Sequence, residues 1–204
     1  HEYAPVFPRQ VTDISFGLGP TTSNLTLLAA GASCAALVPD ASTPTNWMQT
    51  SGVDESGWLG DPGGIGYDES STYLPYIGVD VGTRADVTAS AYGRWTFTVD
   101  DPAAIVSLVL RAKYDDGFIA WINGVRVAGT NAPAVPAWNS AATAAHADAA
   151  AVLDETFGID GAAAFLVPGT NVLAVQILNT SAGSSDLLFV PELVAGVGSA
   201  FGDP

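Results

Sequence analysis

The stretch that decides the fold is Tyr114-Asp-Asp-Gly-Phe-Ile-Ala-Trp-Ile-Asn-Gly-Val-Arg-Val127. It holds two turn signals on either side of a short apolar run. Asp-Asp-Gly at 115–117 is a strong turn signal, and Asn123-Gly124 is the pair most typical of a two-residue β-hairpin. The run between them, Phe118 to Ile122, has the length of a strand rather than a helix. The stretch therefore predicts consecutive strands joined by tight turns.

Strand patterns continue on both sides of this stretch. Residues 95–99 alternate apolar and polar side chains, as a half-buried strand does, and residues 105–114 repeat the pattern. Two further strands are predicted at 171–178 and 187–194, linked by a turn rich in Ser and Gly. Several short strands with almost no amphipathic helix predict an all-β protein, a jelly-roll-like β-sandwich.

Two segments depart from the strand pattern. Residues 45–86 are rich in Gly, Asp, Ser and aromatic residues but have few continuous apolar runs, which predicts a long structured connection rather than a helix. Residues 140–153 are rich in alanine, whose intrinsic preference is helical. Because small side chains bury little surface, this second segment is predicted as either a short helix or a loop.

The chain of 204 residues has the size of one domain, or of one domain plus an arm. Residues 1–40 are predicted as an N-terminal arm or as accessory strands, because residues 11–16 alternate and short apolar runs follow them. The jelly-roll β-sandwich is expected at 41–194. A C-terminal tail is expected at 195–204.

Composition and charge exclude several classes of function. Hydrophobic residues make up 48% of the chain, so a core is available. Six Lys and Arg stand against 21 Asp and Glu, giving a net charge of −15, so nucleic acid is not an expected partner. No run of about 18 apolar residues occurs, so membrane insertion is not expected. A single cysteine, Cys34, excludes an internal disulfide framework.

The residue usage also bears on location. The chain has 22 Gly, 13 Pro and many small polar residues, as secreted proteins do. We expect an extracellular or cell-surface protein. Its acidity suits a saline or calcium-rich medium, where screening relaxes self-repulsion; the alternative is that the acidity only keeps the surface soluble.

Motifs for catalysis are missing from the sequence. There is no Gly-x-Ser-x-Gly elbow, no Walker loop and no His-Glu-x-x-His. His146 and Asp148 could form an acid–base pair, and the alternative is a histidine that caps a loop. A pair of glycosidase carboxylates cannot be recognised in sequence, because the pairing is a distance in space. The chain is therefore not expected to be an enzyme.

Seven motifs, taken in order, resemble a known module. They are Gly64-Ile-Gly-Tyr67, Tyr76-Ile-Gly-Val-Asp80, Arg94-Trp-Thr-Phe-Thr-Val-Asp-Asp-Pro102, the stretch at 114–127, Ala132-Pro-Ala-Val-Pro-Ala-Trp-Asn-Ser140, Gly169-Thr-Asn-Val-Leu-Ala-Val175 and Ser184-Ser-Asp-Leu-Leu-Phe-Val-Pro-Glu-Leu193. The module is similar to the galactose-binding-like jelly-roll domains and is found in large secreted bacterial multidomain proteins. The resemblance spans roughly residues 45–194. It implies a fold but no particular ligand, because jelly rolls host many functions.

The Asp-Asp-Gly turn followed by Ile-Asn-Gly is also similar to lectin domains related to the anthrax protective antigen. In the calcium-dependent members two adjacent Asp residues coordinate calcium, which in turn holds sugar hydroxyls. The resemblance thus implies Asp115 and Asp116 as metal residues and calcium as a cofactor, although the remaining ligands of that family cannot be mapped onto this chain. The alternative is that both side chains only shape the turn through hydrogen bonds to the backbone.

Aromatic residues in the loops predict a sugar platform, because flat rings stack on the C–H face of a pyranose while amides take its hydroxyls. Trp138 and Asn139, in a Pro-rich loop, are the leading ligand-binding candidates. Trp58 and Tyr73 complete the predicted site. The alternative for each ring is burial, which is expected for Trp121 in mid-strand. The rings considered are Trp47, Trp58, Tyr73, Trp121 and Trp138.

Two functional hypotheses follow. The first is a non-catalytic, extracellular adhesive or binding module whose partner is a glycan or surface polymer, and glycan binding leads. The second is a structural subunit of a self-assembling extracellular filament or surface layer. In that case the arm at residues 1–40 would complete the open sheet of an identical subunit.

Overall fold

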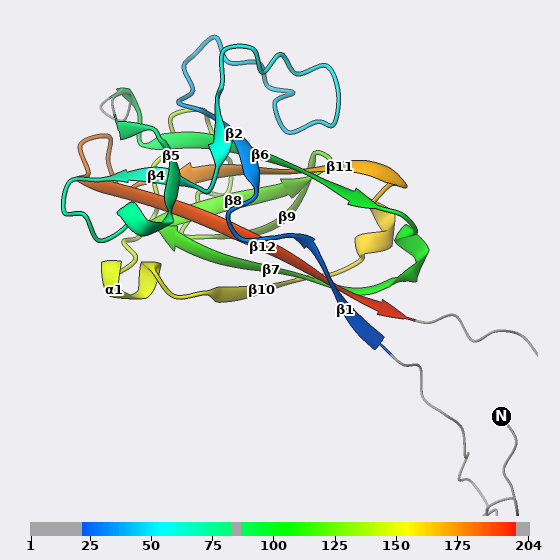
Figure 1. Cartoon of the computed structure of the whole chain (residues 1–204). Coiled ribbons are helices and arrows are strands. Elements are labelled where there is room, and N and C mark those ends of the chain that lie inside the picture. Colours follow the sequence, from blue (N-terminus) through cyan, green and yellow to red (C-terminus); the bar gives the residue numbers. More distant parts are fainter. Residues whose placement is uncertain (1–21, 83–86, 199–204) are drawn as a thin grey trace, which may run out of the picture.

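The computed structural model describes residues 22–82 and 87–198, and two six-stranded sheets face each other in it (Figure 1). Sheet A has the order β10 (Glu155–Ile159), β7 (Ile105–Asp115), β12 (Asp186–Gly198), β4 (Gly64–Asp68) and β5 (Ile77–Asp80), with β1 (Thr22–Leu28) also paired to β12. Sheet B has the order β3 (Leu59–Pro62), β2 (Ser33–Leu37), β6 (Ser90–Val99), β11 (Gly169–Leu178), β8 (Gly117–Ile122) and β9 (Val125–Thr130). The predicted all-β sandwich is confirmed.

The helical elements whose bounds lie within the described residues are single turns between strands. These are η1 (Leu74–Tyr76), η3 (Pro102–Ala104), α1 (Asp148–Ala151) and η4 (Ala162–Ala164). The alanine-rich segment at 140–153 is thus a loop with one helical turn. Within the described ranges, none of the helices has the length and hydrophobicity needed to cross a membrane.

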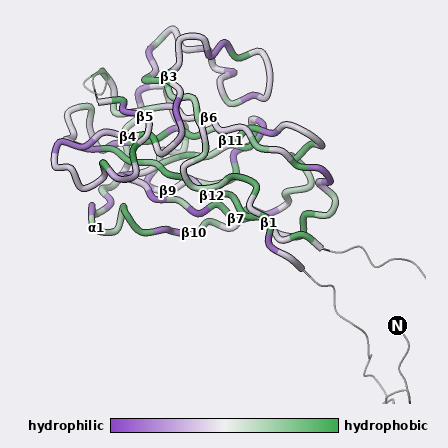
Figure 2. Tube along the Cα trace, viewed as in Figure 1, coloured by the Kyte–Doolittle hydropathy of each residue, from purple (hydrophilic) through white to green (hydrophobic). Residues whose placement is uncertain are grey.

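The core lies between the two sheets and follows from the period-two alternation of the strands. In β6, Trp95 and Phe97 are buried while the threonines beside them are exposed. The rings of Trp95 and Phe118 in sheet B approach Phe189 of sheet A, with centroids 5.8 and 5.0 Å apart. Figure 2 shows hydrophobic residues along the strands that run through the middle of the sandwich.

The two turn signals of the deciding stretch have different roles. Asn123 and Gly124 have φ angles of 52° and 84°, as the turn of a two-residue hairpin requires, and they join β8 to β9. The turn at Asp115-Asp116-Gly117 instead joins β7 of sheet A to β8 of sheet B. It therefore carries the chain from one layer of the sandwich to the other.

The described part of the predicted arm belongs to the sandwich. β1 pairs with β12, and β2 pairs with β6, so these strands are part of the two sheets, while the domain bounds at 40 and 194 stay predictions. Residues 1–21, which include the alternating run at 11–16, lie outside the described residues. At the other end β12 continues to Gly198, into the expected tail.

Other strands were not predicted. The expected connection at 45–86 contains β3, β4 and β5, each of four or five residues. β10 was also missed. Such short strands, interrupted by glycine, show too few alternations for a pattern to be recognised.

Gly93 on β6 makes room for the Trp95 indole. A Cβ at position 93 would lie 2.6 Å from the Trp95 ring and 2.6 Å from Cδ1 of Ile65, both of which are buried. A Cβ added to Gly158 on β10 would have no other atom within 4 Å. The two glycines therefore form a matched pair for measuring how tightly the core is packed.

We expect Gly93→Ala to lower the free energy of unfolding by about 1–3 kcal/mol, because a rigid, buried ring must move. Gly158→Ala should change it by about 0.5 kcal/mol or less. Urea unfolding followed by circular dichroism measures both. Equal effects of the two substitutions would contradict the packing described for β6.

Candidate functional site

The outer face of sheet B carries an apolar cluster separate from the core. Tyr92 of β6 and Trp121 of β8 are both buried in it. Between them lies β11, whose Ala174 is in register with Arg94 on one side and with Trp121 on the other. Because Ala174 is small, aromatic rings can extend over it from both neighbouring strands. This face of the sheet therefore presents rings to the loops that cover it.

Trp47, from the loop at 38–58, completes the cluster. Its ring is stacked on Tyr92, with centroids 3.9 Å apart and planes 13° from parallel. It meets Trp121 edge-on at 5.4 Å and 78°. These contacts leave Trp47 only 4% exposed and hold it in one orientation.

Arg94 ties the same loop to the sheet. Its side chain is 5% exposed, and its Nε donates to Oε1 of Glu55 at 2.5 Å. Nη1 donates to the carbonyl oxygens of Trp47 and, at 3.0 Å, Gln49. A buried guanidinium needs such partners, because an unpaired charge inside a protein is costly. Arg94 thus positions the backbone on either side of Met48 and the ring of Trp47.

Side chains of β6 and β11 form hydrogen bonds with the Pro-rich loop at 131–140. Nε2 of Gln176 donates to the carbonyl oxygen of Ala137 at 2.8 Å and to Oγ of Ser90 at 2.9 Å. Oγ of Ser90 in turn donates to the carbonyl oxygen of Ser140 at 2.7 Å. These bonds bracket Trp138 on both sides and fix the loop that carries it.

A hollow of about 300 Å³ opens between the two loops. Its size is at the lower end of the range of about 300–1,000 Å³ found for small-molecule sites. Among the described residues, none with a charged side chain lines it. The lining residues are Ala41, Thr43, Pro44, Thr45, Trp47, Met48, Tyr92, Trp121, Pro136, Ala137, Trp138 and Gln176.

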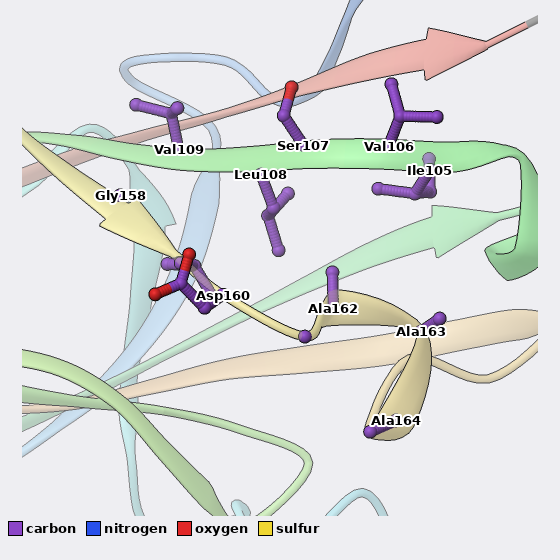
Figure 3. Close-up of a pocket in the computed structure, with 12 residues that line it drawn as sticks. Ile105, Val106, Ser107, Leu108, Val109, Gly158, Asp160, Ala162, Ala163 and Ala164 are labelled. Carbon is purple, nitrogen blue, oxygen red and sulfur yellow. The ribbon is translucent and has the colours of Figure 1, made fainter.

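A larger hollow of about 530 Å³ lies beside the start of β7 (Figure 3). Residues 105–109 line one side, and residues 158–164 line the other. The described residues around it are aliphatic or small, with Asp160 and Ser107 as the polar side chains, and none is aromatic. It offers no ring for stacking, so the aromatic hollow on sheet B is the candidate site.

The predicted ligand-binding residues separate into three groups. Trp138 lines the hollow and is partly buried, and Asn139 beside it is exposed. Trp58 packs against the same aromatic cluster but is not among the residues that line the hollow. Tyr73 was wrongly placed in the site. It is 0% exposed and packs with Leu188 on the outer face of sheet A, where no sugar can reach its ring.

Several lining residues were not predicted as a site. Tyr92, Thr43, Met48 and Gln176 come from separate parts of the chain and meet only in the fold. The one available signal was the alternation of β6, which places Tyr92 and Arg94 on the face opposite Trp95.

The acidic pair predicted to bind metal lies at the crossing from β7 to β8. Asp116 accepts backbone N–H donors with both carboxylate oxygens, from His146 to Oδ1 and from Thr180 to Oδ2, each at 2.9 Å. Its own N–H donates to the carbonyl oxygen of Leu178 at 3.0 Å. Asp116 thereby fastens two loops that are distant in sequence to the crossing point.

Asp115 is only 2% exposed. Burial raises its pKa from the ordinary 3.8 to about 8, and the negative charges of Asp116, Asp186 and Asp148 act in the same direction. Burial and the charge of Asp148 also raise the pKa of Asp186. A proton on Asp115 therefore relieves the repulsion among these carboxylates at neutral pH.

These side chains do not fit a calcium site as arranged. Calcium takes about six to eight oxygen ligands. Both oxygens of Asp116 already accept backbone hydrogen bonds. Within residues 22–82 and 87–198, no group of three or more His, Cys, Asp or Glu side chains could hold a metal ion.

His146 has a structural setting. Its ring is stacked on Tyr114, with centroids 4.2 Å apart, and Nδ1 lies 2.9 Å from the Tyr114 carbonyl oxygen. Nε2 lies 3.0 Å from Oε1 of Glu155, so the carboxylate beside the ring is Glu155 and not Asp148. Oε2 of Glu155 accepts the Tyr114 hydroxyl at 2.8 Å. The ring thus joins the loop to β7 and β10.

No protein-family model and no curated protein matches the chain. Among solved structures, a Bacteroides uniformis β-glucuronidase matches with a TM-score of 0.50 at 17% identity, over 86% of this chain and 18% of that one. An uncultured Clostridium sp. β-glucuronidase gives 0.45 at 12% identity, over 91% and 31%. A β-D-mannosidase from Dictyoglomus thermophilum gives 0.39 at 14%, over 76% and 16%. The first match shows a shared β-sandwich fold, over less than a fifth of that enzyme.

This match corrects one expectation. The chain was not expected to be an enzyme, because its sequence lacks catalytic motifs. A similar β-sandwich, however, forms part of a β-glucuronidase. The lack of catalytic motifs therefore does not show that the chain is unrelated to enzymes. The match also supports the β-sandwich part of the resemblance, while membership of the module of secreted bacterial proteins stays a prediction.

The Arg94 contacts lead to a stability test. We expect Arg94→Ala to lower the free energy of unfolding by about 2–3 kcal/mol, because two carbonyl oxygens and Glu55 lose their donor. Arg111→Ala is the matched control. Arg111 forms an exposed pair with Glu192, so its loss should cost about 0.5 kcal/mol or less. Urea unfolding measures both, and equal losses would show that Arg94 does not hold the loop.

The buried carboxyl of Asp115 predicts a pH dependence. Its folded pKa is raised, so the folded state keeps a proton that the unfolded chain releases. This contribution to stability is full below about pH 4 and is lost as the pH rises toward 8, at about 1.4 kcal/mol per pH unit at most. Asp115→Asn should flatten the fall in Tm between about pH 5 and pH 8. Asp160→Asn, at an exposed position, should leave it unchanged. A slope unaltered in Asp115→Asn would refute the assignment.

Proposed function

We propose that the chain binds a glycan in the aromatic hollow of sheet B, as the carbohydrate-binding β-sandwich domain of a glycosidase-related protein. The observation that carries the proposal is the arrangement of four rings. The stacked pair Trp47–Tyr92 and the edge of Trp121 form one side of the hollow, and Trp138 comes from the facing loop. Aromatic surfaces with a few polar groups are the usual composition of a sugar site.

The rings have different roles in this proposal. Trp47, Tyr92 and Trp121 are nearly buried and form a rigid wall. Trp138 is more accessible, so its ring is the one on which the C–H face of a pyranose would stack. Thr43 and Thr45 line the hollow, and their hydroxyls can form hydrogen bonds with sugar hydroxyls. Because Arg94 and Gln176 already hold the two loops, binding requires little ordering of the protein.

The shared fold supports the glycosidase-related part of the proposal. The β-sandwich occurs within a β-glucuronidase, although the likeness is one of fold alone. The activity of any larger protein and the sugar it acts on belong to this proposal and not to the match. An extracellular location stays a prediction.

The filament hypothesis gains no support from the described residues. In the part of the arm that the structure describes, β1 pairs with β12 of the same chain and β2 with β6. These strands complete the chain's own sheets, so they are not available to a neighbouring subunit in this arrangement. Self-assembly through residues 1–21 stays a prediction.

We expect Trp138→Ala to weaken binding to a neutral polysaccharide by about tenfold or more, because the stacking ring is lost while the fold remains. Trp58→Ala is the matched control, since Trp58 packs on the same cluster without lining the hollow. Affinity electrophoresis against a panel of soluble glycans measures both variants, and circular dichroism checks folding. Binding by Trp138→Ala that equals the wild type would refute the proposed site.

A further inference from the structure

We infer that the hollow takes an uncharged sugar ring and rejects sugars that carry carboxylate, sulfate or phosphate groups. The inference rests on the proposed glycan binding and specifies its ligand class. Its support is the position of charged side chains relative to the hollow, above all of the cations in the described part of the chain.

Cations are scarce, and three of the four described ones are held in ion pairs and do not line the hollow. Arg94 is buried against Glu55 and two carbonyl oxygens, below the loop. Arg111 and Lys113 lie on β7 in the other sheet, paired with Glu192 at 3.1 Å and with Asp154 at 2.5 Å. No guanidinium or ammonium of the described residues therefore lines the hollow to meet an anion.

Arg126 comes nearest to the Pro-rich loop. It is exposed on β9, and its Nη1 lies 3.5 Å from the carbonyl oxygen of Ala134, the distance of a weak hydrogen bond. Ala134 is outside the set of lining residues, which begins in this loop at Pro136. Arg126 is therefore the one described cation whose contribution an experiment has to exclude.

Acidic residues, in contrast, lie on the loop at 38–58, which contributes one side of the hollow. Asp40 precedes the lining residue Ala41, and its carboxylate accepts hydrogen bonds from the hydroxyl and the N–H of Ser42, which lower its pKa and keep it ionised. Asp54 lies on the same loop, as does Glu55, whose charge is paired with Arg94. The whole chain has a net charge of −15. An anionic sugar would approach against this field and lose its hydration without gaining a counter-charge.

The polar groups that do line the hollow are neutral. They include the hydroxyls of Thr43 and Thr45 and the amide of Gln176, whose Nε2 is already bonded to Ser90 and Ala137. Hydroxyls both donate and accept, so they match sugar hydroxyls well. Two hydroxyls and an amide whose Nε2 is already engaged leave few donors to balance a full negative charge in a partly buried site.

The test uses matched polysaccharides that differ only in charge. A β-glucan, a mannan and a galactan are each compared with the same polymer after oxidation of its primary alcohols to carboxylates. Affinity is measured by isothermal titration calorimetry at neutral pH in low and in high salt. We expect the wild type to bind at least one neutral polymer and to bind its oxidised form about tenfold more weakly or worse, with a smaller difference in high salt.

Two variants make the test specific. Ala137 is exposed and lines the hollow, so Ala137→Lys brings an ammonium to the site. It should strengthen binding of the oxidised polymer about tenfold and leave the neutral one within about threefold. Arg126→Gln should leave the preference of the wild type unchanged.

The outcomes separate the inference from the proposed function. If the wild type binds an oxidised polymer as tightly as the neutral one, and Trp138→Ala weakens both, the hollow binds sugars but the inferred selectivity is refuted. If neither form of any polymer binds to the wild type or to Ala137→Lys, the proposed function fails and the inference fails with it.

Discussion

A single buried cation constrains how this protein presents its outer surface. Arg94 sits on a strand beneath a loop of some twenty residues, and its guanidinium requires acceptors once water is excluded. Two carbonyl oxygens and Glu55 supply them only when the loop at 38–58 is folded down over sheet B. The same closure brings Trp47 onto Tyr92. The hydrogen bonds of Arg94 and the stacking of Trp47 on Tyr92 thus stabilise the same conformation of the loop.

The parts of the fold that sequence predicts are those determined locally. The alternation of residues 95–99 and the Asn123-Gly124 turn were sufficient, because the strand period and the hairpin turn depend on neighbouring residues. The site was only partly predictable. Trp138 was identified from its loop, but the stack of Trp47 on Tyr92 joins residues far apart in the chain. Tyr73 shows the opposite error, since an aromatic residue in a Gly- and Ser-rich segment resembles a surface ring until packing buries it.

The architecture separates the interior packing from the candidate site. The interior between the sheets is filled by side chains such as Trp95, Phe118 and Phe189, and these set the fold that the chain shares with part of a glycosidase. The candidate site lies on the opposite face of the same strands and uses their alternate residues. The alternation of a strand therefore supplies the interior packing with one set of residues and the candidate site with the other.

The pairing of β1 with β12 has a mechanical consequence. Thr22 is in register with Gly198, so the first and last described residues lie side by side at one end of the β1–β12 ladder. A force applied between them would act across the β1–β12 ladder at its open end and separate its hydrogen bonds one after another, as in unzipping. β1 would detach at low force, while β6, β8 and β11, which carry the aromatic hollow, would stay unloaded. Under tension the domain would thus lengthen at its edge strand and keep the strands of the candidate site intact.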